Sequence, residues 1–363
     1  MAKVSLKNVT KKFNGRTVVD NLNLEVEDGM FACLLGEPGA GKTTTLKMIA
    51  GLENPDAGEI YLDDVLINNV EPRHRDVAMT FQSYALYPHM TVYDNLAYPL
   101  RRRKMPKDEI DQRVKRAADL LRITELLDKR PGLCSGGERQ RVALGRTLVR
   151  QPKLYLFDEP LTNLDAKLRV HMRVELKKIQ KEIGQTAIFA SPDEVEATTM
   201  ADKIAILKDG KLLQYGTFRN IYDHPATQYV ATFVGSPPMN TIDCSLEENN
   251  AKTYLNAGTF KIDVTENRSL IKSEATSTEL LIGIRPSDIG VKNAPRTEED
   301  FEGTIFIKEP MGVDTILDIR VGDMIFKAKV PLTAPFVLDQ KVWVNFVKDR
   351  MHVIDKKTGR VIY

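Results

Sequence analysis

The sequence has little cysteine and no long apolar run. Only three cysteines occur among 363 residues, Cys33, Cys134 and Cys244, and none forms a C-x-x-C pair. A disulfide framework or a cysteine zinc site is therefore not expected, and a reducing cytosol is the expected compartment. No apolar stretch approaches the ~18 residues that span a bilayer, and residues 1–7 lack the apolar run of a signal peptide. Any role at a membrane is therefore expected to come through a partner.

Neither sign of charge is in excess. Lysine and arginine total 52 against 50 acidic residues, a net charge of +2, so the composition does not indicate a nucleic-acid partner. Hydrophobic residues make up 42% and charged residues 28%, which is the balance of a globular protein. Because a single core rarely exceeds ~250–300 residues, a chain of 363 residues predicts two domains. Histidine is scarce as well, and the five are His74, His89, His171, His224 and His352.

The first part of the chain alternates apolar runs with helical patterns. The predicted buried strands are residues 30–35, 154–157, 186–190 and 203–207. The predicted helices are residues 41–52, 106–122, 166–183 and 193–201. Strands that alternate with helices indicate an α/β domain with a parallel sheet, into which a mostly helical segment, about 83–150, is inserted. Four basic residues at 101–104 precede one predicted helix, and a solvated turn is the simplest interpretation of them.

The composition changes after residue 235. Ser236-Pro237-Pro238 is typical of a linker. The β-rich runs that follow are residues 280–284, 303–307, 315–321, 324–330 and 342–346. Their spacing predicts a small antiparallel barrel or sandwich. We therefore expect one domain over residues 1–235 and an all-β domain over residues 236–363.

Residues 36–43 read Gly-Glu-Pro-Gly-Ala-Gly-Lys-Thr. They fit G-x-x-x-x-G-K-[ST], the phosphate-binding loop, and they stand where that loop requires, after a strand and at the start of a helix. The glycines let backbone N–H groups turn toward an anion, and the helix N-terminus adds partial positive charge. Lys42 is expected to reach the β- and γ-phosphates, and Thr43 is expected to offer its hydroxyl to Mg²⁺.

Two carboxylates follow the apolar run at 154–157. Asp158 and Glu159 emerge where a parallel strand ends, which is where ligands bind in open α/β sheets. Asp158 is expected to hold Mg²⁺, and Glu159 is expected to orient or deprotonate the attacking water. Together with the phosphate-binding loop they predict the hydrolysis of a nucleotide.

Residues 134–141, Cys-Ser-Gly-Gly-Glu-Arg-Gln-Arg, resemble the signature motif of ABC-transporter ATPases. Residues 80–83 are similar to the Q-loop of that family, and residues 162–165 to its D-loop. The resemblance covers essentially the whole chain. The segments similar to maltose-type importers of bacteria and archaea are residues 85–92, 283–286 and 355–359. In that subgroup the C-terminal β-domain is an OB-like regulatory module.

The resemblance implies a P-loop ABC ATPase domain with a helical subdomain, in which two ATPase domains meet head to tail and enclose two ATP molecules. The helix opened by Ser135 then faces the γ-phosphate held by the other subunit. Phe13 falls where the family stacks an aromatic ring on adenine, and a core aromatic is the alternative. The implied nucleotide-binding residues are Phe13, Gly36, Gly39, Ala40, Gly41, Lys42, Thr43, Thr44, Ser135, Gly136, Gly137, Glu138 and Asp165. The implied catalytic residues are Glu159 and Gln82, and the implied magnesium ligands are Thr43, Gln82 and Asp158.

Three positions depart from the family pattern. Cys134 replaces the usual leucine before the signature serine, which is a packing change. Glu138 replaces a common glutamine and places a carboxylate beside a phosphate-binding helix. Pro192 stands where the family carries a switch histidine, and none of the five histidines lies nearby. Proline has no side-chain donor, and the loss of one transition-state donor typically costs ~10²–10³ in rate.

Two accounts of Pro192 remain open. In the first, which we slightly favour, the chain pairs with a different ATPase subunit that keeps its histidine. In the second, a homodimer hydrolyses ATP without the histidine and relies on Glu159, with Ser191 or Asp193 as a further contributor. Retention of Lys42, Thr43, Asp158 and Glu159 argues against a wholly inactive ATPase domain.

The leading functional hypothesis is the energy-coupling ATPase of an importer for a carbohydrate or related solute, peripheral on the cytoplasmic face. Its implied partners are two transmembrane permease subunits, a second ATPase subunit and, indirectly, an extracytoplasmic solute-binding protein. The alternative is a catalytically impaired ATP-binding subunit with a structural or regulatory role, for which Pro192 is the evidence. A soluble ABC ATPase of translation or DNA repair would normally carry tandem domains or a coiled coil, and neither is visible in the sequence.

Overall fold

The computed structural model describes residues 2–81, 84–249, 252–297 and 299–363. The chain divides into two compact units, Met1–Phe218 and Arg219–Tyr363, and each is described by itself. The expected domain boundary after residue 235 falls inside the second unit, and it remains a prediction. Within the described residues, no helix combines the length and the apolar character needed to cross a membrane.

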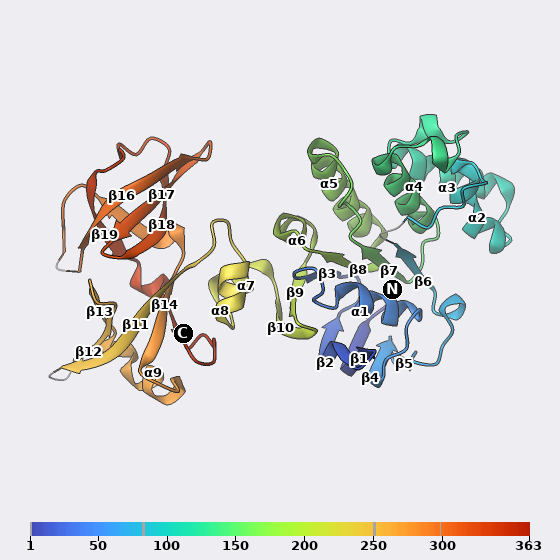
Figure 1. Cartoon of the computed structure of the whole chain (residues 1–363). Helices are drawn as coiled ribbons and strands as arrows, with labels where there is room; N and C mark the ends of the chain where they lie inside the picture. Colours follow the sequence, from blue (N-terminus) through green and yellow to red (C-terminus); the bar gives the residue numbers. More distant parts are fainter. Residues whose placement is uncertain (1, 82–83, 250–251, 298) are drawn as a thin grey trace. The chain divides into compact units, whose positions relative to one another are not determined.

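A six-stranded sheet forms the centre of the first unit, in the order β10-β9-β3-β8-β7-β6 (Figure 1). Its strands are β3 (Phe31–Leu35), β6 (Val77–Thr80), β7 (Leu154–Asp158), β8 (Thr186–Ser191), β9 (Lys203–Lys208) and β10 (Lys211–Gly216). The pairs β3–β8, β3–β9, β6–β7 and β7–β8 are parallel, and only β10 pairs antiparallel, at one edge. The four predicted buried strands and the parallel sheet are therefore confirmed.

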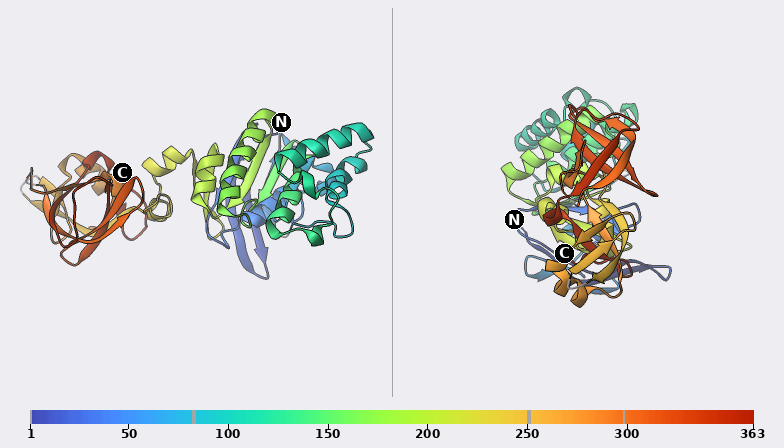
Figure 2. Two further views of the ribbon diagram at one scale, coloured as in Figure 1. Left: turned by 90° about the horizontal axis from the view of Figure 1, so that it is seen from above. Right: turned by 90° about the vertical axis from the view of Figure 1, so that its left-hand side faces the viewer.

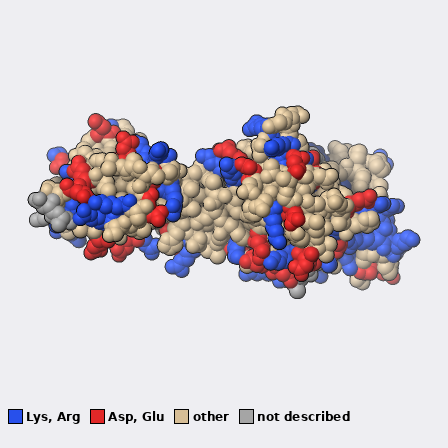
Figure 3. Space-filling model, turned by 90° about the horizontal axis from the view of Figure 1, so that it is seen from below, with Lys and Arg blue, Asp and Glu red and all other residues tan. Residues whose placement is uncertain are grey.

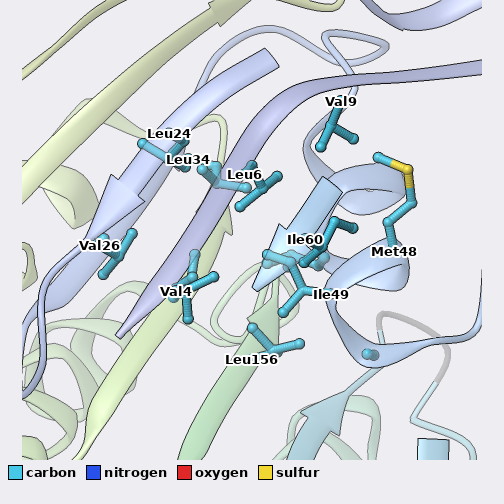
Figure 4. Close-up of a cluster of buried hydrophobic side chains, with 14 of the residues drawn as sticks. Val4, Leu6, Val9, Leu24, Val26, Leu34, Met48, Ile49, Ile60 and Leu156 are labelled. Carbon is cyan, nitrogen blue, oxygen red and sulfur yellow. The ribbon is translucent and has the colours of Figure 1, made fainter. Parts of the chain in front are cut away.

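A second, antiparallel sheet lies in the same unit, in the order β2-β1-β4-β5. Its strands are β1 (Val4–Phe13), β2 (Arg16–Val26), β4 (Ala57–Leu62) and β5 (Val65–Leu66). Apolar side chains of β1, β2 and β4 pack against α1 (Lys42–Ala50) and against one face of the parallel sheet. Figure 4 shows Leu6, Ile49 and Leu156 of this core together. The helix that follows the phosphate-binding loop is thus held between two sheets.

The remaining helices of the first unit cover the opposite face of the parallel sheet or extend beyond it (Figure 1). They are α2 (Val92–Arg102), α3 (Lys107–Leu120), α4 (Gly136–Leu148), α5 (Ala166–Ile183) and α6 (Glu194–Met200). The helices predicted over 106–122, 166–183 and 193–201 are confirmed as α3, α5 and α6, with ends within two residues. The helices α2, α3 and α4 make up the inserted segment, which is helical as expected.

The second unit begins within α7 (Phe218–Asp223), whose first residue ends the first unit. The helix α8 (Gln228–Phe233) and then antiparallel strands follow. One sheet joins β13 (Lys261–Asp263), β12 (Lys252–Asn256), β11 (Asn240–Asn249), β14 (Glu279–Ile284) and β20 (His352–Asp355). The other joins β15 (Ile289–Lys292), β19 (Lys341–Phe346), β16 (Phe301–Pro310), β17 (Asp314–Val321) and β18 (Met324–Pro331). A short helix, α9 (Arg268–Glu274), lies between β13 and β14.

The two sheets of this unit share one apolar core, and the views in Figure 2 show their strands curving around a common interior. All five runs predicted as strands are strands, so the expected small antiparallel β-domain is confirmed. Arg285, which follows β14, is 2% exposed. Its guanidinium donates to the carbonyls of Ala231, Val234 and Tyr222. Arg285 therefore links α7 and α8 to the β-domain, which is a structural reason for an arginine in the run 283–286.

Asp355, at the end of β20, is a second buried charge of this unit. Its carboxylate accepts the N–H and the hydroxyl of Thr276 at 2.6 and 2.7 Å. It also accepts the N–H and the hydroxyl of Thr358 at 2.7 and 2.9 Å. Burial by itself raises the pKa of Asp355, but these four hydrogen bonds outweigh it and hold the pKa well below its ordinary value.

Replacing Asp355 by asparagine is expected to destabilise the second unit by about 2 kcal/mol at pH 7, because the amide keeps one acceptor oxygen of two. The depressed pKa makes the wild-type contribution complete above the unfolded-state value of about 3.9 and lost as the pH falls below it. Calorimetric unfolding from pH 7 to pH 3 should therefore show a wild-type loss on the acid side that the variant lacks. Equal pH dependence in both proteins would contradict this assignment.

Candidate nucleotide-binding site

Three adjacent strands bring the predicted catalytic segments to one edge of the sheet. In the parallel sheet β8 lies between β3 and β7, with Leu35 opposite Ser191 and Asp158 opposite Ala190. The phosphate-binding loop leaves β3, Glu159 leaves β7, and Pro192 leaves β8. The carboxyl ends of parallel strands meet at one edge, so these segments surround one site.

The phosphate-binding loop requires its glycines. Gly39 and Gly41 have φ values of 87° and 94°, in the left-handed region that other residues rarely adopt. A Cβ on Gly41 would also stand 2.7 Å from the carbonyl oxygen of Val18. Ala40 is 5% exposed and packs into the core beneath the loop. The N–H groups of Lys42, Thr43 and Thr44 begin α1 and have no carbonyl of their own helix to bond, so they remain for phosphate oxygens.

Lys42 is buried and already oriented. Its ammonium donates to the carbonyl oxygens of Gly36 at 2.7 Å and Glu37 at 3.0 Å, and the residue is 4% exposed. Burial lowers the pKa of Lys42, while the negative charges of Glu159 and Asp158 raise it. A phosphate would supply the counter-charge that this partly desolvated ammonium favours.

The Thr43 hydroxyl donates to the Asp158 carboxylate at 2.8 Å, which brings two predicted magnesium ligands together. Burial raises the pKa of Asp158, and the Glu159 charge adds to this while the Thr43 hydrogen bond opposes it. A divalent cation would offset the cost of burying the charge of this carboxylate. A hydroxyl and a carboxylate are the hard oxygen ligands that Mg²⁺ prefers. The residues therefore fit the ion. Gln82, the third predicted ligand, lies outside the described residues.

Glu159 sits in a constrained turn. Its φ is 47°, its N–H donates to the Ala190 carbonyl at 3.1 Å, and its carboxylate accepts the Thr162 hydroxyl at 3.3 Å. The Gln140 amide donates to the Glu159 carbonyl at 3.3 Å and accepts the N–H of Asn163 at 3.1 Å. Sequence reasoning missed Gln140 and Thr162 as supports of Glu159, although both lie inside the motifs it singled out.

The signature segment caps the helix that it opens. The Ser135 hydroxyl accepts the N–H of Glu138 at 3.3 Å, and the Glu138 carboxylate accepts the N–H of Ser135 at 2.6 Å. This reciprocal capping box lowers the pKa of Glu138. Gly136 and Gly137 occupy the first turn of α4. Glu138 therefore has a structural role at the helix start, beside the place where the resemblance puts the phosphate of another subunit.

Cys134, the residue before the capping serine, is 5% exposed. Its thiol lies 3.6 Å from the carbonyl of Arg130, and burial raises its pKa. A thiol that stays protonated is a poor nucleophile, so the structure agrees with the packing interpretation.

Phe13 and Asp165, two further predicted nucleotide contacts, lie in different surroundings. Phe13, at the end of β1, is 39% exposed with the Lys11 ammonium 5.1 Å from its ring. It is thus not a core aromatic, and a ring in this position is free to stack on a base. Asp165 caps α5, where its carboxylate accepts the N–H of Leu168 at 3.0 Å. Both remain predicted nucleotide contacts.

Pro192 is exposed at the edge where the phosphate-binding loop lies. The neighbouring Ser191 hydroxyl donates to the buried Glu196 carboxylate at 2.6 Å and accepts the N–H of Asp193 at 3.0 Å. Asp193 in turn caps α6. Both polar neighbours of Pro192 are therefore occupied within this segment.

A groove of about 570 Å³ opens beside the site, between the end of α1, β6, α2 and α4. The lining combines five arginines with apolar and aromatic residues and contains no carboxylate. The arginines are Arg73, Arg102, Arg103, Arg146 and Arg150. Figure 3 shows Lys and Arg gathered at the end of the first unit that carries α2 and α3 in Figure 1. Residues 101–104, expected as a solvated turn, belong to this surface. Arg101 and Arg102 end α2, and Arg102 and Arg103 line the groove.

Family models match three parts of the chain. The ABC transporter model matches residues 19–162, the MalK OB fold domain model matches residues 235–289, and the TOBE domain model matches residues 282–354. The first match spans the phosphate-binding loop, the signature segment and Glu159. The other two lie in the second unit.

Similar proteins span the whole chain. The trehalose/maltose import ATP-binding protein MalK of Thermococcus litoralis is 45% identical over 375 aligned residues, covering 100% of both chains. The sn-glycerol-3-phosphate import ATP-binding protein UgpC of Cupriavidus metallidurans is 52% identical, covering 100% of this chain and 99% of the relative. A solved dimeric ATP-binding cassette, MJ0796 in a post-hydrolysis state bound to ADP and Pi, is 30% identical with a TM-score of 0.56. It covers 59% of this chain and 98% of that one.

Three features together define a nucleotide-binding ATPase fold. They are the phosphate-binding loop on a parallel sheet, the acidic strand end beside it, and the helix that begins with the signature glycines and caps itself. The chain belongs to the ABC transporter family, in the group of import ATP-binding subunits that carry a C-terminal MalK OB fold domain. It is thus an ATPase subunit whose activity is coupled to transport. The comparisons give no support to the alternative of an impaired, mainly regulatory subunit.

Proposed function

We propose that this chain binds Mg²⁺ and ATP and hydrolyses the ATP to drive the import of a carbohydrate or a related solute such as a polyol phosphate. The observation that carries the proposal is the convergence of Lys42, Asp158 and Glu159 at one edge of the sheet, with Thr43 bonded to Asp158 at 2.8 Å. The solute class rests on the relatives, whose names specify trehalose/maltose and sn-glycerol-3-phosphate import.

The residues divide the chemistry between them. The α1 N-terminus and Lys42 bind the phosphates, and Phe13 stacks on the base. Thr43 and Asp158 would hold Mg²⁺, which when bound would neutralise charge on the phosphate oxygens. Glu159 accepts a proton from the attacking water or orients it, and its constrained turn keeps the carboxylate in place.

The second ATPase subunit is proposed to be another copy of this chain. The comparisons give no support to the heteromeric pair that the sequence slightly favoured, and the similar cassette MJ0796 was solved as a dimer. In such a pair Ser135, Gly136 and Gly137 of one copy face the nucleotide on the other. The helix N-terminus then presents free N–H groups to the γ-phosphate.

The arginine-lined groove is proposed to receive a cytoplasmic helix of a permease subunit. Apolar and aromatic walls suit the buried face of a helix, and Arg102, Arg146 and Arg150 suit acidic residues on it. Arg73 and Arg103 are already paired with Glu71 and Asp76. In this proposal the chain works at the cytoplasmic face of the membrane. A solute-binding protein on the other side completes the importer.

Replacing Arg102 by glutamate is expected to weaken association with the permease pair by about 10-fold, because like charges then meet at the rim of the groove. Arg102 is exposed, and its substitution leaves the ATP site untouched. The measurement is the affinity of the purified chain for the detergent-solubilised permeases, together with ATP binding in the same sample. Arg116→Glu is the matched control, because Arg116 is 78% exposed on α3 and does not line this groove. Wild-type affinity in Arg102→Glu would argue against this docking site.

A further inference from the structure

Thr80, the last residue of β6, carries a buried hydroxyl that the described chain leaves unbonded. The residue is 6% exposed, and its Oγ1 atom has no hydrogen-bond partner among the described residues. A buried hydroxyl without a partner costs free energy, and buried polar groups of this kind are commonly satisfied by ordered water. The hydroxyl therefore indicates a small polar ligand beside it.

A small cavity lies at this hydroxyl, between the ends of β6 and β7 and the helix α4. Thr80, Gln140 and Glu159 contribute to its lining, together with apolar residues of α4. The room for the centre of a water molecule is about 10 Å³, which suits one water and nothing larger. The size of the cavity therefore defines the ligand as a single water molecule.

Gln140 brings a second polar group to this cavity. The residue is 7% exposed, and its amide nitrogen carries two donors. One N–H donates to the Glu159 carbonyl at 3.3 Å, and the amide oxygen accepts the N–H of Asn163 at 3.1 Å. The other N–H has no partner within the described part of the chain. Thr80 and Gln140 together thus offer the bonds that a buried water requires.

The cavity lies on the opposite face of the parallel sheet from the phosphate-binding loop. Thr80 is the register partner of Phe157, so both side chains point to the face that α4 covers. Leu156 points to the other face, into the core that contains α1, and Asp158 follows two residues later on that same side. A water in the cavity is therefore distinct from the water that attacks the γ-phosphate.

We propose that Thr80 is a positioning residue that holds Glu159 in place through one buried water. The water bonds the Thr80 hydroxyl and the remaining N–H of Gln140, and Gln140 in turn fixes the Glu159 carbonyl. Glu159 requires such support, because its φ of 47° persists only where surrounding contacts impose it. The inference rests on the proposed function, since it takes Glu159 as the group that acts on the attacking water.

The experiment uses Thr80→Val in the full chain, because valine keeps the branched shape and removes the hydroxyl. The kcat of ATP hydrolysis should fall by about 10-fold, as expected for the loss of one hydrogen bond that orients the base. The KM for ATP should stay unchanged, because Lys42 and the start of α1 are untouched. Thr80→Ser restores the hydroxyl and should recover most of the rate.

Thr315→Val is the matched control. Thr315 is 1% exposed, and its hydroxyl likewise lacks a partner among the described residues. It lies on β17 of the second unit, so its loss should leave hydrolysis unchanged. In a Gln140→Leu background Thr80→Val should have little further effect, because both substitutions remove the same bridge.

A crystal structure of the chain with ATP tests the water directly. Electron density for one water is expected within hydrogen-bond distance of Thr80 Oγ1 and Gln140 Nε2, and none is expected there in Thr80→Val. A dry cavity in the wild-type protein would overturn the inference, and so would a wild-type kcat in Thr80→Val. A fall in kcat that follows thermal stability and is not recovered by serine would show a structural role alone, which also contradicts it.

Failure of the proposed function gives a different result. If Glu159 does not act on the attacking water, Glu159→Gln hydrolyses ATP at the wild-type rate. If only the role of Thr80 is wrong, Glu159→Gln is impaired while Thr80→Val is as active as the wild type.

Discussion

Replacing Glu159 by glutamine should lower ATP hydrolysis by about 10²–10⁴-fold, the usual contribution of a general base, while ATP binding persists. Glutamine has the same shape and keeps the turn, since the N–H bond to Ala190 and the carbonyl bond from Gln140 belong to the backbone. Only the ability to accept a proton is lost. A single-turnover assay with labelled ATP measures the rate, and calorimetric titration measures binding.

The matched control is Glu125→Gln, because Glu125 is an exposed carboxylate in the helical segment outside the site. Hydrolysis at the wild-type rate in Glu159→Gln would refute the assignment of the base. The same variant tests the dimer, because ATP that is bound but not hydrolysed should hold two chains together. Light scattering should then give about twice the monomer mass of 40.9 kDa. A species that stays at the monomer mass would favour the heteromeric pair.

Replacing Pro192 by histidine should raise the rate of hydrolysis by about 10², because it restores one donor to the developing charge on the γ-phosphate. The position is exposed at the edge where the phosphate-binding loop lies. Its neighbours do not already supply the donor, since the Ser191 hydroxyl is bonded to Glu196 at 2.6 Å. The steady-state rate of the purified chain, with its pH profile, is the measurement.

Pro192→Ala is the control, because it removes the proline ring without adding an imidazole. No comparable rise in the rate of hydrolysis is expected for it. A higher rate of hydrolysis in both variants would show that the proline ring itself limits the reaction. An unchanged rate in Pro192→His would show that the transition state is already fully stabilised by groups elsewhere in the site. Either result would contradict the account of a missing donor.

The antiparallel sheet of the first unit shows what sequence reasoning overlooked. Asn14 and Gly15 separate β1 from β2, and both have positive φ values, 48° and 81°. An Asn-Gly pair between two strand-like runs is a strong hairpin signal, so this element was predictable. The buried parallel strands were easier to predict, because a short unbroken apolar run indicates a strand that is buried on both faces.

The supports of the site were harder to predict for a different reason. The bond between Thr43 and Asp158 joins residues 115 apart in sequence, and Gln140 reaches Asn163 across 23 residues. Motif spacing indicates which side chains have the right chemistry. It does not give the distances that decide which of them meet.

By itself the sequence determined the phosphate-binding loop, the acidic strand end, the signature helix, the β-rich second unit and the missing histidine. Each of these features is encoded by a few consecutive residues, and its local geometry follows from the positions of glycine, proline and apolar residues. Tertiary structure alone decided that β8 lies between β3 and β7, that arginines from α2 and α4 line one groove, and that Arg146 donates to the Ala85 carbonyl across 61 residues. These are long-range contacts, and they are fixed by how two sheets and several helices bury their apolar faces together, which no short stretch of sequence contains.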